Sequence, residues 1–151
     1  MVLDYLEIEI SEFCNLNCKG CTNCSNIATR KQFYEFDEYS KDLHRISEIF
    51  SGIKKIRLLG GEPFLNPRIV DYAGLVRELF PDSDLRIVTN GLLLPRIDIA
   101  VLRELSRLGA FLDISAYPPS RKRRKQIAAR LNEAGLGFNF GPPVVVFFKQ
   151  L

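Results

Sequence analysis

Four cysteines lie within residues 14–24, in the stretch CNLNCKGCTNC, and the rest of the chain contains none. Three of them, Cys14, Cys18 and Cys21, have the spacing C-x3-C-x2-C, which is short enough for their thiolates to surround one inorganic centre. Iron–sulfur clusters are bound by cysteine thiolates, and a cubane cluster held by only three leaves one iron open to another ligand. Structural zinc sites more often combine two separated ligand pairs, so an iron–sulfur cluster is favoured, with a zinc knuckle or a redox thiol as the alternatives.

The fourth cysteine, Cys24, follows Cys21 by three residues. It could be a spare ligand, a thiol that faces substrate, or a small buried residue. We favour the last interpretation, because free cysteine is among the residue types most often buried. The sequence therefore predicts three ligands and one cysteine outside the cluster.

Composition and charge narrow the class of protein. The chain has 151 residues and a formal net charge of +3, from 21 basic and 18 acidic residues. This balance does not favour nucleic acid or a membrane as a partner. The N-terminus, MVLDYLEIEI, is acidic where a secretory signal is basic, and no apolar run approaches the roughly 20 residues that span a bilayer. We expect a cytoplasmic protein, in a reducing compartment where clustered thiols bind metals more often than they form disulfides.

The cysteines must be positioned by regular elements, and strand-like and helix-like patterns alternate along the chain. Runs with period-two alternation, and short apolar runs, predict five strands, at residues 5–10, 55–59, 85–89, 111–115 and 136–140. A sixth run, at residues 144–148, is a candidate for one more strand. Helical spacing of apolar residues predicts a helix that stops near Gly52, one that begins at Asn66 and Pro67, one that ends at Gly109, and one over residues 121–134. This alternation predicts an α/β fold of five or six parallel strands, as an open sheet or a barrel.

The unusual stretches all follow predicted strands. CNLNCKGCTNC, GGEP at residues 60–63, TNG at 89–91 and SAYPP at 115–119 each come directly after one. Because the carboxyl ends of parallel strands meet at one edge, we expect these stretches to share a rim.

The cysteine motif, together with GGEP after the second predicted strand, resembles the radical S-adenosylmethionine (radical SAM) superfamily over residues 7–140. The resemblance implies a partial (β/α)6 TIM-like barrel of about five to six parallel strands. The family's core commonly has six strand–helix units and then a substrate-binding extension. Residues 1–151 would therefore be a single radical SAM core domain that lacks the last barrel unit and a C-terminal substrate-binding extension, as a minimal enzyme, a piece of a longer protein, or a domain whose barrel a partner completes. The substrate cannot be inferred without that extension.

The resemblance implies a role for individual residues. Cys14, Cys18 and Cys21 would ligate a [4Fe-4S] cluster, whose fourth iron would bind S-adenosylmethionine. The cofactor would be bound by residues of the other rim stretches, with Gly60, Gly61 and Glu62 receiving its amino group and Ser115 contacting its ribose: Gly60, Gly61, Glu62, Pro63, Thr89, Asn90 and Ser115. Reductive cleavage would give a 5'-deoxyadenosyl radical that abstracts hydrogen from an unknown substrate. The alternative function is a non-catalytic iron–sulfur or zinc module for electron transfer or scaffolding.

Two further features carry expectations. The family often has an aromatic residue just before the third cysteine, where this chain has Gly20, so we expect adenine to pack against Phe13 or Tyr117 instead. The basic run RKRRK, residues 121–125, would lie in the first turns of a helix and oppose its dipole. Its simplest interpretation is a solvated helix face; a docking patch for an acidic electron donor of the flavodoxin or ferredoxin type is a further hypothesis.

Overall fold

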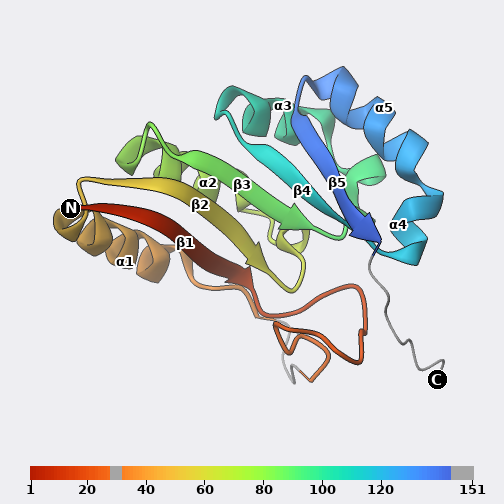
Figure 1. Ribbon diagram of the computed structural model, residues 1–151, viewed down its shortest axis with the longest axis horizontal. Helices are drawn as coiled ribbons and strands as arrows, with labels where there is room; N and C mark the ends of the chain where they lie inside the picture. The colour runs from red at the N-terminus through yellow and green to blue at the C-terminus, as the bar shows by residue number, and fades with distance from the viewer. Residues whose placement is uncertain (28–31, 144–151) are drawn as a thin grey trace.

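The structure, a computed structural model, describes residues 1–27 and 32–143. Its centre is one sheet of parallel strands in the order β1-β2-β3-β4-β5 (Figure 1). The strands are β1 Val2–Ser11, β2 Gly52–Gly60, β3 Asp84–Thr89, β4 Phe111–Ala116 and β5 Gly137–Pro143. Each predicted strand within the described residues is present, and the expected α/β, partial-barrel architecture is confirmed.

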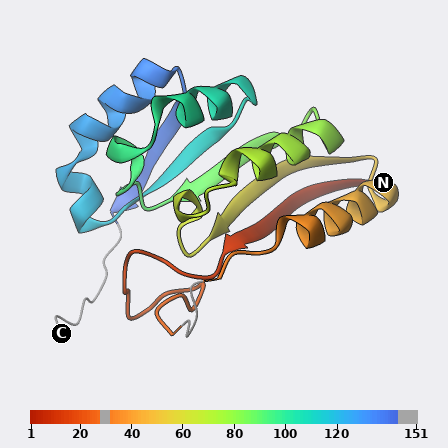
Figure 2. The same cartoon turned by 180° about the vertical axis from the view of Figure 1, so that it is seen from behind.

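The helices lie together on one face of the sheet, as the two opposite views show (Figures 1 and 2). They are α1 Phe36–Ile49, α2 Ile69–Leu79, α3 Ile99–Arg107, α4 Pro118–Lys122 and α5 Arg124–Ala134, with single 3-10 turns η1 Pro63–Leu65 and η2 Leu94–Arg96. Each strand pairs with the next strand in the sequence, which is the arrangement that helical crossovers between parallel strands produce. No helix in the described part of the chain is long and apolar enough to cross a membrane.

Alternation along the strands separates two chemically different faces. Side chains on the helix side form the core, and Ile56, Leu58, Ile87 and Leu112 are fully buried there. Burying such aliphatic side chains stabilises the fold by roughly 1.5–3 kcal/mol each relative to leaving them exposed. The helices and the sheet therefore share one apolar layer.

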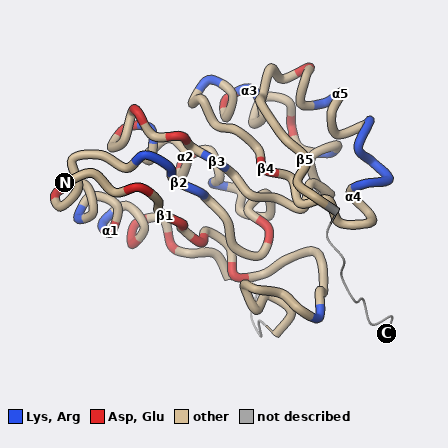
Figure 3. The backbone as a smooth tube through the Cα atoms, in the orientation of Figure 1, with Lys and Arg blue, Asp and Glu red and all other residues tan. Residues whose placement is uncertain are grey.

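The open face of the sheet is charged instead. Figure 3 shows acidic residues of β1 beside basic residues of β2, and the contacts continue onto the neighbouring strands. Arg57 pairs with Glu7 at 2.9 Å, and Arg86 Nη1 lies 3.4 Å from the Asp113 carboxylate. Because these side chains are partly exposed, each pair adds little to stability, but together they keep the open face polar.

Two expected helix boundaries were wrong. The first helix ends at Ile49, and Gly52 is already the first residue of β2. The second begins at Ile69 rather than at Pro67, because Asn66 folds a turn of its own, in which its Oδ1 accepts the Arg68 N–H at 2.9 Å. The run at 144–148 lies outside the described residues.

The helix expected over 121–134 is two helices. Pro118 and Pro119 start α4 three residues before the basic run, as proline does at a helix N-terminus, and Arg123 separates α4 from α5. Arg121 and Lys122 therefore lie in a last turn, where positive charge is favoured, and only the residues after Arg123 oppose a helix dipole.

Candidate functional site

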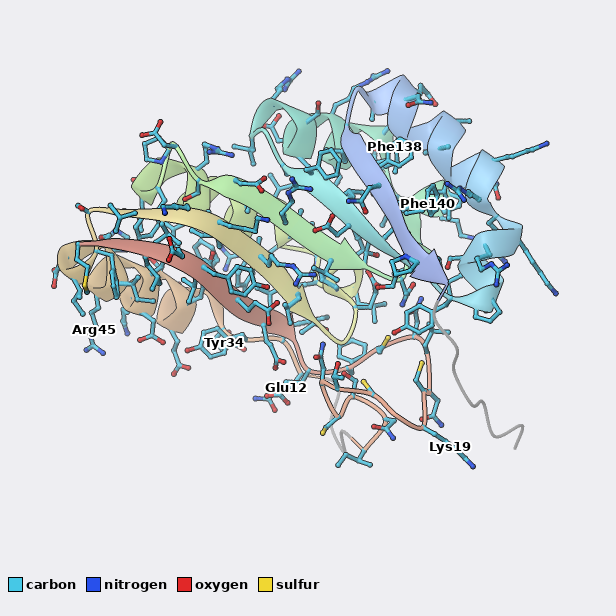
Figure 4. The ribbon with its side chains drawn as sticks, viewed as in Figure 1. Glu12, Lys19, Tyr34, Arg45, Phe138 and Phe140 are labelled. Carbon is cyan, nitrogen blue, oxygen red and sulfur yellow. The ribbon has the colours of Figure 1, made fainter. Side chains whose placement is uncertain are left out.

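The cysteine loop, defined as residues 12–27, follows β1 at the carboxyl ends of the strands (Figure 1). Cys14, Cys18 and Cys21 line one cavity of about 360 Å³. Cys18 is buried, whereas Cys14 and Cys21 are half-buried. Lys19, between them in sequence, points away from the sheet (Figure 4). The loop thus turns three thiols toward the strand ends and its charge outward.

The rest of the cavity wall comes from four strands and the turns that follow them. Of the residues predicted to bind the cofactor, five line it: Gly60, Gly61, Thr89, Asn90 and Ser115. The rim predicted from the order of the motifs is thus one cavity wall in the structure. The cofactor-binding roles themselves stay predictions.

Glycine at positions 60 and 61 is required by the cysteine loop. A Cβ on Gly61 would lie 2.1 Å from the carbonyl oxygen of Phe13, and one on Gly60 would lie 2.2 Å from that of Ser11. Gly60 also has φ of +133°, in the region that favours glycine. The Gly61 N–H donates to Ser11 O at 2.7 Å. These glycines therefore let β2 approach the start of the cysteine loop, in addition to lining the cavity.

Glu62 is buried beneath the cavity rather than lining it. Its side chain is fully buried, and it is not among the described residues that line the cavity. Its Oε1 accepts Thr89 Oγ1–H at 2.7 Å and Phe64 N–H at 3.2 Å, and its Oε2 accepts Asn90 N–H at 2.8 Å. Burial raises the pKa of Glu62 to about 7, while the three hydrogen bonds act in the opposite direction. The carboxylate joins the end of β2 to the end of β3.

Of the other residues predicted at the site, Ser115 and Tyr117 line the cavity, and Pro63 and Phe13 do not. Pro63 is buried at the start of η1, outside the cavity wall of the described chain, and it follows Glu62 in extended backbone as expected. Ser115 and Tyr117 line the cavity from the end of β4. Phe13 does not contribute to this wall; its ring packs against Phe33, with centroids 5.1 Å apart. Of the two aromatic residues expected near adenine, Tyr117 is therefore the one at the cavity.

The cavity is electrostatically unfavourable for unbound thiolates. Burial raises the pKa of Cys14 and of Cys18, and it raises the pKa of Tyr117, to which the nearby Cys18 also contributes. A cation or a metal cluster would offset this cost, because a coordinating metal favours the deprotonated thiol.

The arrangement of donors fits a cluster. Among residues 1–27 and 32–143, no three cysteine, histidine, aspartate or glutamate side chains lie close enough together to hold a single metal ion. A cubane cluster binds each thiolate through a different iron, so its ligands need to share a cavity rather than converge on one point. Three cysteines around one cavity meet that requirement.

Cys24 is placed differently from the favoured expectation. It is exposed, not buried, and its φ of +54° places it in a left-handed turn in which its N–H donates to Cys21 O at 3.2 Å. The expectation of burial was wrong because the general tendency of cysteine to be buried does not decide the position of a residue in this left-handed surface turn. Cys24 is also outside the described cavity wall, as a cysteine outside the cluster should be.

Sequence reasoning missed two charged residues of the cavity wall, Glu7 and Arg57. They lie on the open face of β1 and β2. For Arg57 the sequence held a signal, because strand alternation puts the neighbour of the buried Leu58 on the opposite face of the sheet. It also missed Asn23, whose Nδ2–H donates to Gly60 O and so holds the cysteine loop against β2.

A partial α/β barrel with three thiols in a cavity at its carboxyl rim defines a class of cofactor-dependent proteins. The model of the radical SAM superfamily matches residues 8–140, and the chain therefore belongs to that superfamily. Its members use a [4Fe-4S] cluster and S-adenosylmethionine for radical chemistry. The family expected from the two motifs is confirmed.

The chain is also similar in sequence to curated proteins. The chain is 33% identical over 114 residues to a GTP 3',8-cyclase of Petrotoga mobilis, covering 74% of this chain and 35% of the relative. It is 29% identical over 139 residues to a GTP 3',8-cyclase of Alkaliphilus oremlandii, covering 91% and 42%. The chain thus spans about two fifths or less of the length of these relatives.

Solved structures share the fold. BtrN in complex with AdoMet and 2-DOIA superposes with a TM-score of 0.64 at 20% identity, covering 93% of this chain and 56% of BtrN. Native anSMEcpe with bound AdoMet and Cp18Cys peptide gives a TM-score of 0.70 at 18% identity, covering 93% of this chain and 42% of anSMEcpe. At these identities the likeness supports the fold alone.

Proposed function

We propose that this chain is the core domain of a radical SAM enzyme, in which it binds the [4Fe-4S] cluster and S-adenosylmethionine. The observation that carries the proposal is the single cavity lined by Cys14, Cys18 and Cys21 on one side and by the ends of β2, β3 and β4 on the other. When bound and reduced, the cluster and S-adenosylmethionine supply a 5'-deoxyadenosyl radical for hydrogen abstraction. The cysteine-rich cavity suits a reducing cytoplasm.

The residues of the cavity would bind and orient the cofactor. The three cysteines would hold the cluster, and the backbone of Gly60 and Gly61 would face the amino group of S-adenosylmethionine. Ser115 would reach the ribose, and Tyr117 would pack against adenine. Glu62 would act from below by fixing the β2 and β3 turns, since its carboxylate already accepts three hydrogen bonds within the protein.

The experiment is anaerobic reconstitution with iron and sulfide, followed by dithionite and S-adenosylmethionine. We expect bound iron and the release of 5'-deoxyadenosine, and loss of both in Cys18→Ala. The alternative is a non-catalytic iron–sulfur or zinc module. A cluster that never cleaves S-adenosylmethionine, even in a longer form of the protein, would favour that module, and zinc uptake without iron would refute the cluster.

We further infer that the substrate is polar. Arg57 lines both the cysteine cavity and a second cavity of about 270 Å³ over the open face of the sheet, which also contacts Asp113 and Asn139. A nonpolar substrate there would displace water from these charged and polar side chains without offering them hydrogen bonds in return, at a cost in desolvation free energy. GTP is the first compound to test, because the curated relatives are named GTP 3',8-cyclases. Consumption of GTP by the reconstituted chain would identify it, whereas 5'-deoxyadenosine release that GTP leaves unchanged would argue against it.

The electron donor is proposed to dock on the basic segment, residues 121–125. All five side chains are exposed, and the segment forms a continuous basic edge at α4 and α5 (Figure 3). An acidic flavodoxin or ferredoxin would be attracted to it. Reversing Arg121 and Arg123 to glutamate should slow reduction by a flavodoxin and leave reduction by dithionite unchanged; equal flavodoxin rates before and after reversal would refute the docking patch.

A further inference from the structure

Asn90, the first residue after β3, is held in one orientation. It is buried, with 5% of its surface exposed. Its backbone N–H donates to Glu62 Oε2 at 2.8 Å, and its side-chain Oδ1 accepts the Leu92 N–H at 3.0 Å. Because the oxygen of the amide is used by the turn, the NH2 group must point the other way. That direction is toward the cysteine loop.

The amide of Asn90 reaches one of the three cysteines. Its Nδ2 lies 3.5 Å from Cys14 Sγ and 2.7 Å from Asn15 Oδ1, so its two hydrogens can serve both acceptors. Cys14 Sγ also accepts the Leu16 N–H at 3.4 Å. Within the described residues, hydrogen bonds to sulfur occur at Cys14 and at neither of the other two candidate ligands. The three thiolates would therefore not be electronically equivalent.

We propose that Asn90 is a positioning residue that donates a hydrogen bond to the Cys14 thiolate and raises the reduction potential of the cluster. The inference rests on the proposed function, because it requires Cys14 to be a cluster ligand. A donor on a ligating sulfur stabilises the added negative charge of the reduced state, and hydrogen bonds to sulfur are among the factors that set cluster potentials. The Glu62 carboxylate contributes indirectly, since it fixes the backbone from which the amide extends.

Two variants separate the donor from the turn. Asn90→Ser keeps an oxygen that can accept the Leu92 N–H, as serine does in turns, but removes the amide donor. Asn90→Asp keeps the shape and the turn acceptor and replaces the donor with a negative oxygen beside the thiolate. Asn139→Ser is the matched control, because that amide donates to Asp113 Oδ1 at 2.8 Å and lies outside the cysteine cavity.

The measurement is the midpoint potential of the reconstituted full chain by spectroelectrochemistry without S-adenosylmethionine, alongside iron content and circular dichroism. We expect Asn90→Ser to lower the equilibrium constant for reduction about tenfold, a negative shift of about 59 mV for one electron. Asn90→Asp should shift it further, and Asn139→Ser should leave it unchanged.

Different results overturn different claims. A wild-type chain that takes up no iron refutes the proposed function, and the inference about Asn90 with it. Wild-type iron content and an unchanged potential in Asn90→Ser refute the inference alone. So does a potential in Asn90→Asp that is equal to or above that of Asn90→Ser. If Asn90→Ser does not fold, Asn90→Asp is compared with the wild type instead. Wild-type iron content and an unchanged potential in Asn90→Asp then refute the inference.

Discussion

The cysteine loop and the two turns beside it divide the work of the site. In the loop, residues 12–27, Cys18 is the single buried residue. The rim turns, defined as residues 60–66 from the end of β2 and 89–91 from the end of β3, contain the buried polar side chains Glu62, Asn66, Thr89 and Asn90. The proposed ligands are thus on the irregular, mostly exposed segment, and the groups that fix its position are on the buried turns. Sites built this way hold their ligands through supporting hydrogen bonds rather than through the ligand segment itself.

The largest effect should come from removing the proposed ligands in the loop. Alanine at Cys14, Cys18 or Cys21 should each reduce iron and sulfide content to background after anaerobic reconstitution, because a cubane cluster with two protein thiolates is poorly held. Iron and sulfide assays with visible absorption measure this. Full iron content in any one of the three variants would show that the wrong cysteines were chosen.

The next largest effect should come from a rim turn that contains no cysteine. Gly61→Ala would place a methyl group 2.1 Å from the Phe13 carbonyl oxygen, which is backbone and cannot move aside alone. We expect a loss of about 3 kcal/mol in the free energy of unfolding, with reduced iron uptake. Gly20→Ala is the matched control within the loop, because nothing lies within 4 Å of its added Cβ. Equal stabilities of the two variants would contradict the claim that the rim turns, and not the loop itself, fix the position of the cysteines.

A smaller effect should appear in the pH dependence of stability. The folded pKa of Glu62, about 7, lies above its ordinary value of 4.5, so its contribution is largest below pH 4.5, falls as pH rises to about 7, and is level above. Relative to Glu62→Gln, the wild type should lose roughly 2–3 kcal/mol across that interval. Denaturant unfolding of both proteins from pH 4 to pH 8 tests the sign, and a difference that grows with pH would contradict it.

The smallest effect should come from Cys24→Ala. Cys24 is exposed and outside the described cavity wall, so iron content and S-adenosylmethionine cleavage should match the wild type. Parallel reconstitution of the two proteins measures this. Loss of iron in this variant would make Cys24 a ligand and would extend the functional part of the loop.

The sequence predicted the strands and the rim because both depend on local patterns. Alternating residues in β1 and apolar runs such as that of β3 indicate strands, and parallel order then gathers their carboxyl ends. The boundary of α4 was also encoded, since Pro118 signals a helix start that the basic run obscured.

Side-chain direction was not predictable in the same way. Nothing in GGEP indicates that the Glu62 carboxylate turns inward, because its partners Thr89 and Asn90 are 27 and 28 residues away in the sequence. The need for glycine at position 61 was likewise not predictable, since the carbonyl oxygen that a Cβ there would contact belongs to Phe13. Such features depend on contacts between elements that are far apart in the sequence.

The contacts that fix the cysteine loop also imply an order of assembly. Asn23 of the loop donates to Gly60 across 37 residues of chain, and Asn90 reaches Cys14 across 76. On a ribosome, the loop would be synthesised before either partner exists, so it can take its final shape only after β3 has emerged. Loading of the cluster should consequently be a late event in folding, and a chain stopped before residue 90 should bind iron weakly although it contains all three proposed ligands.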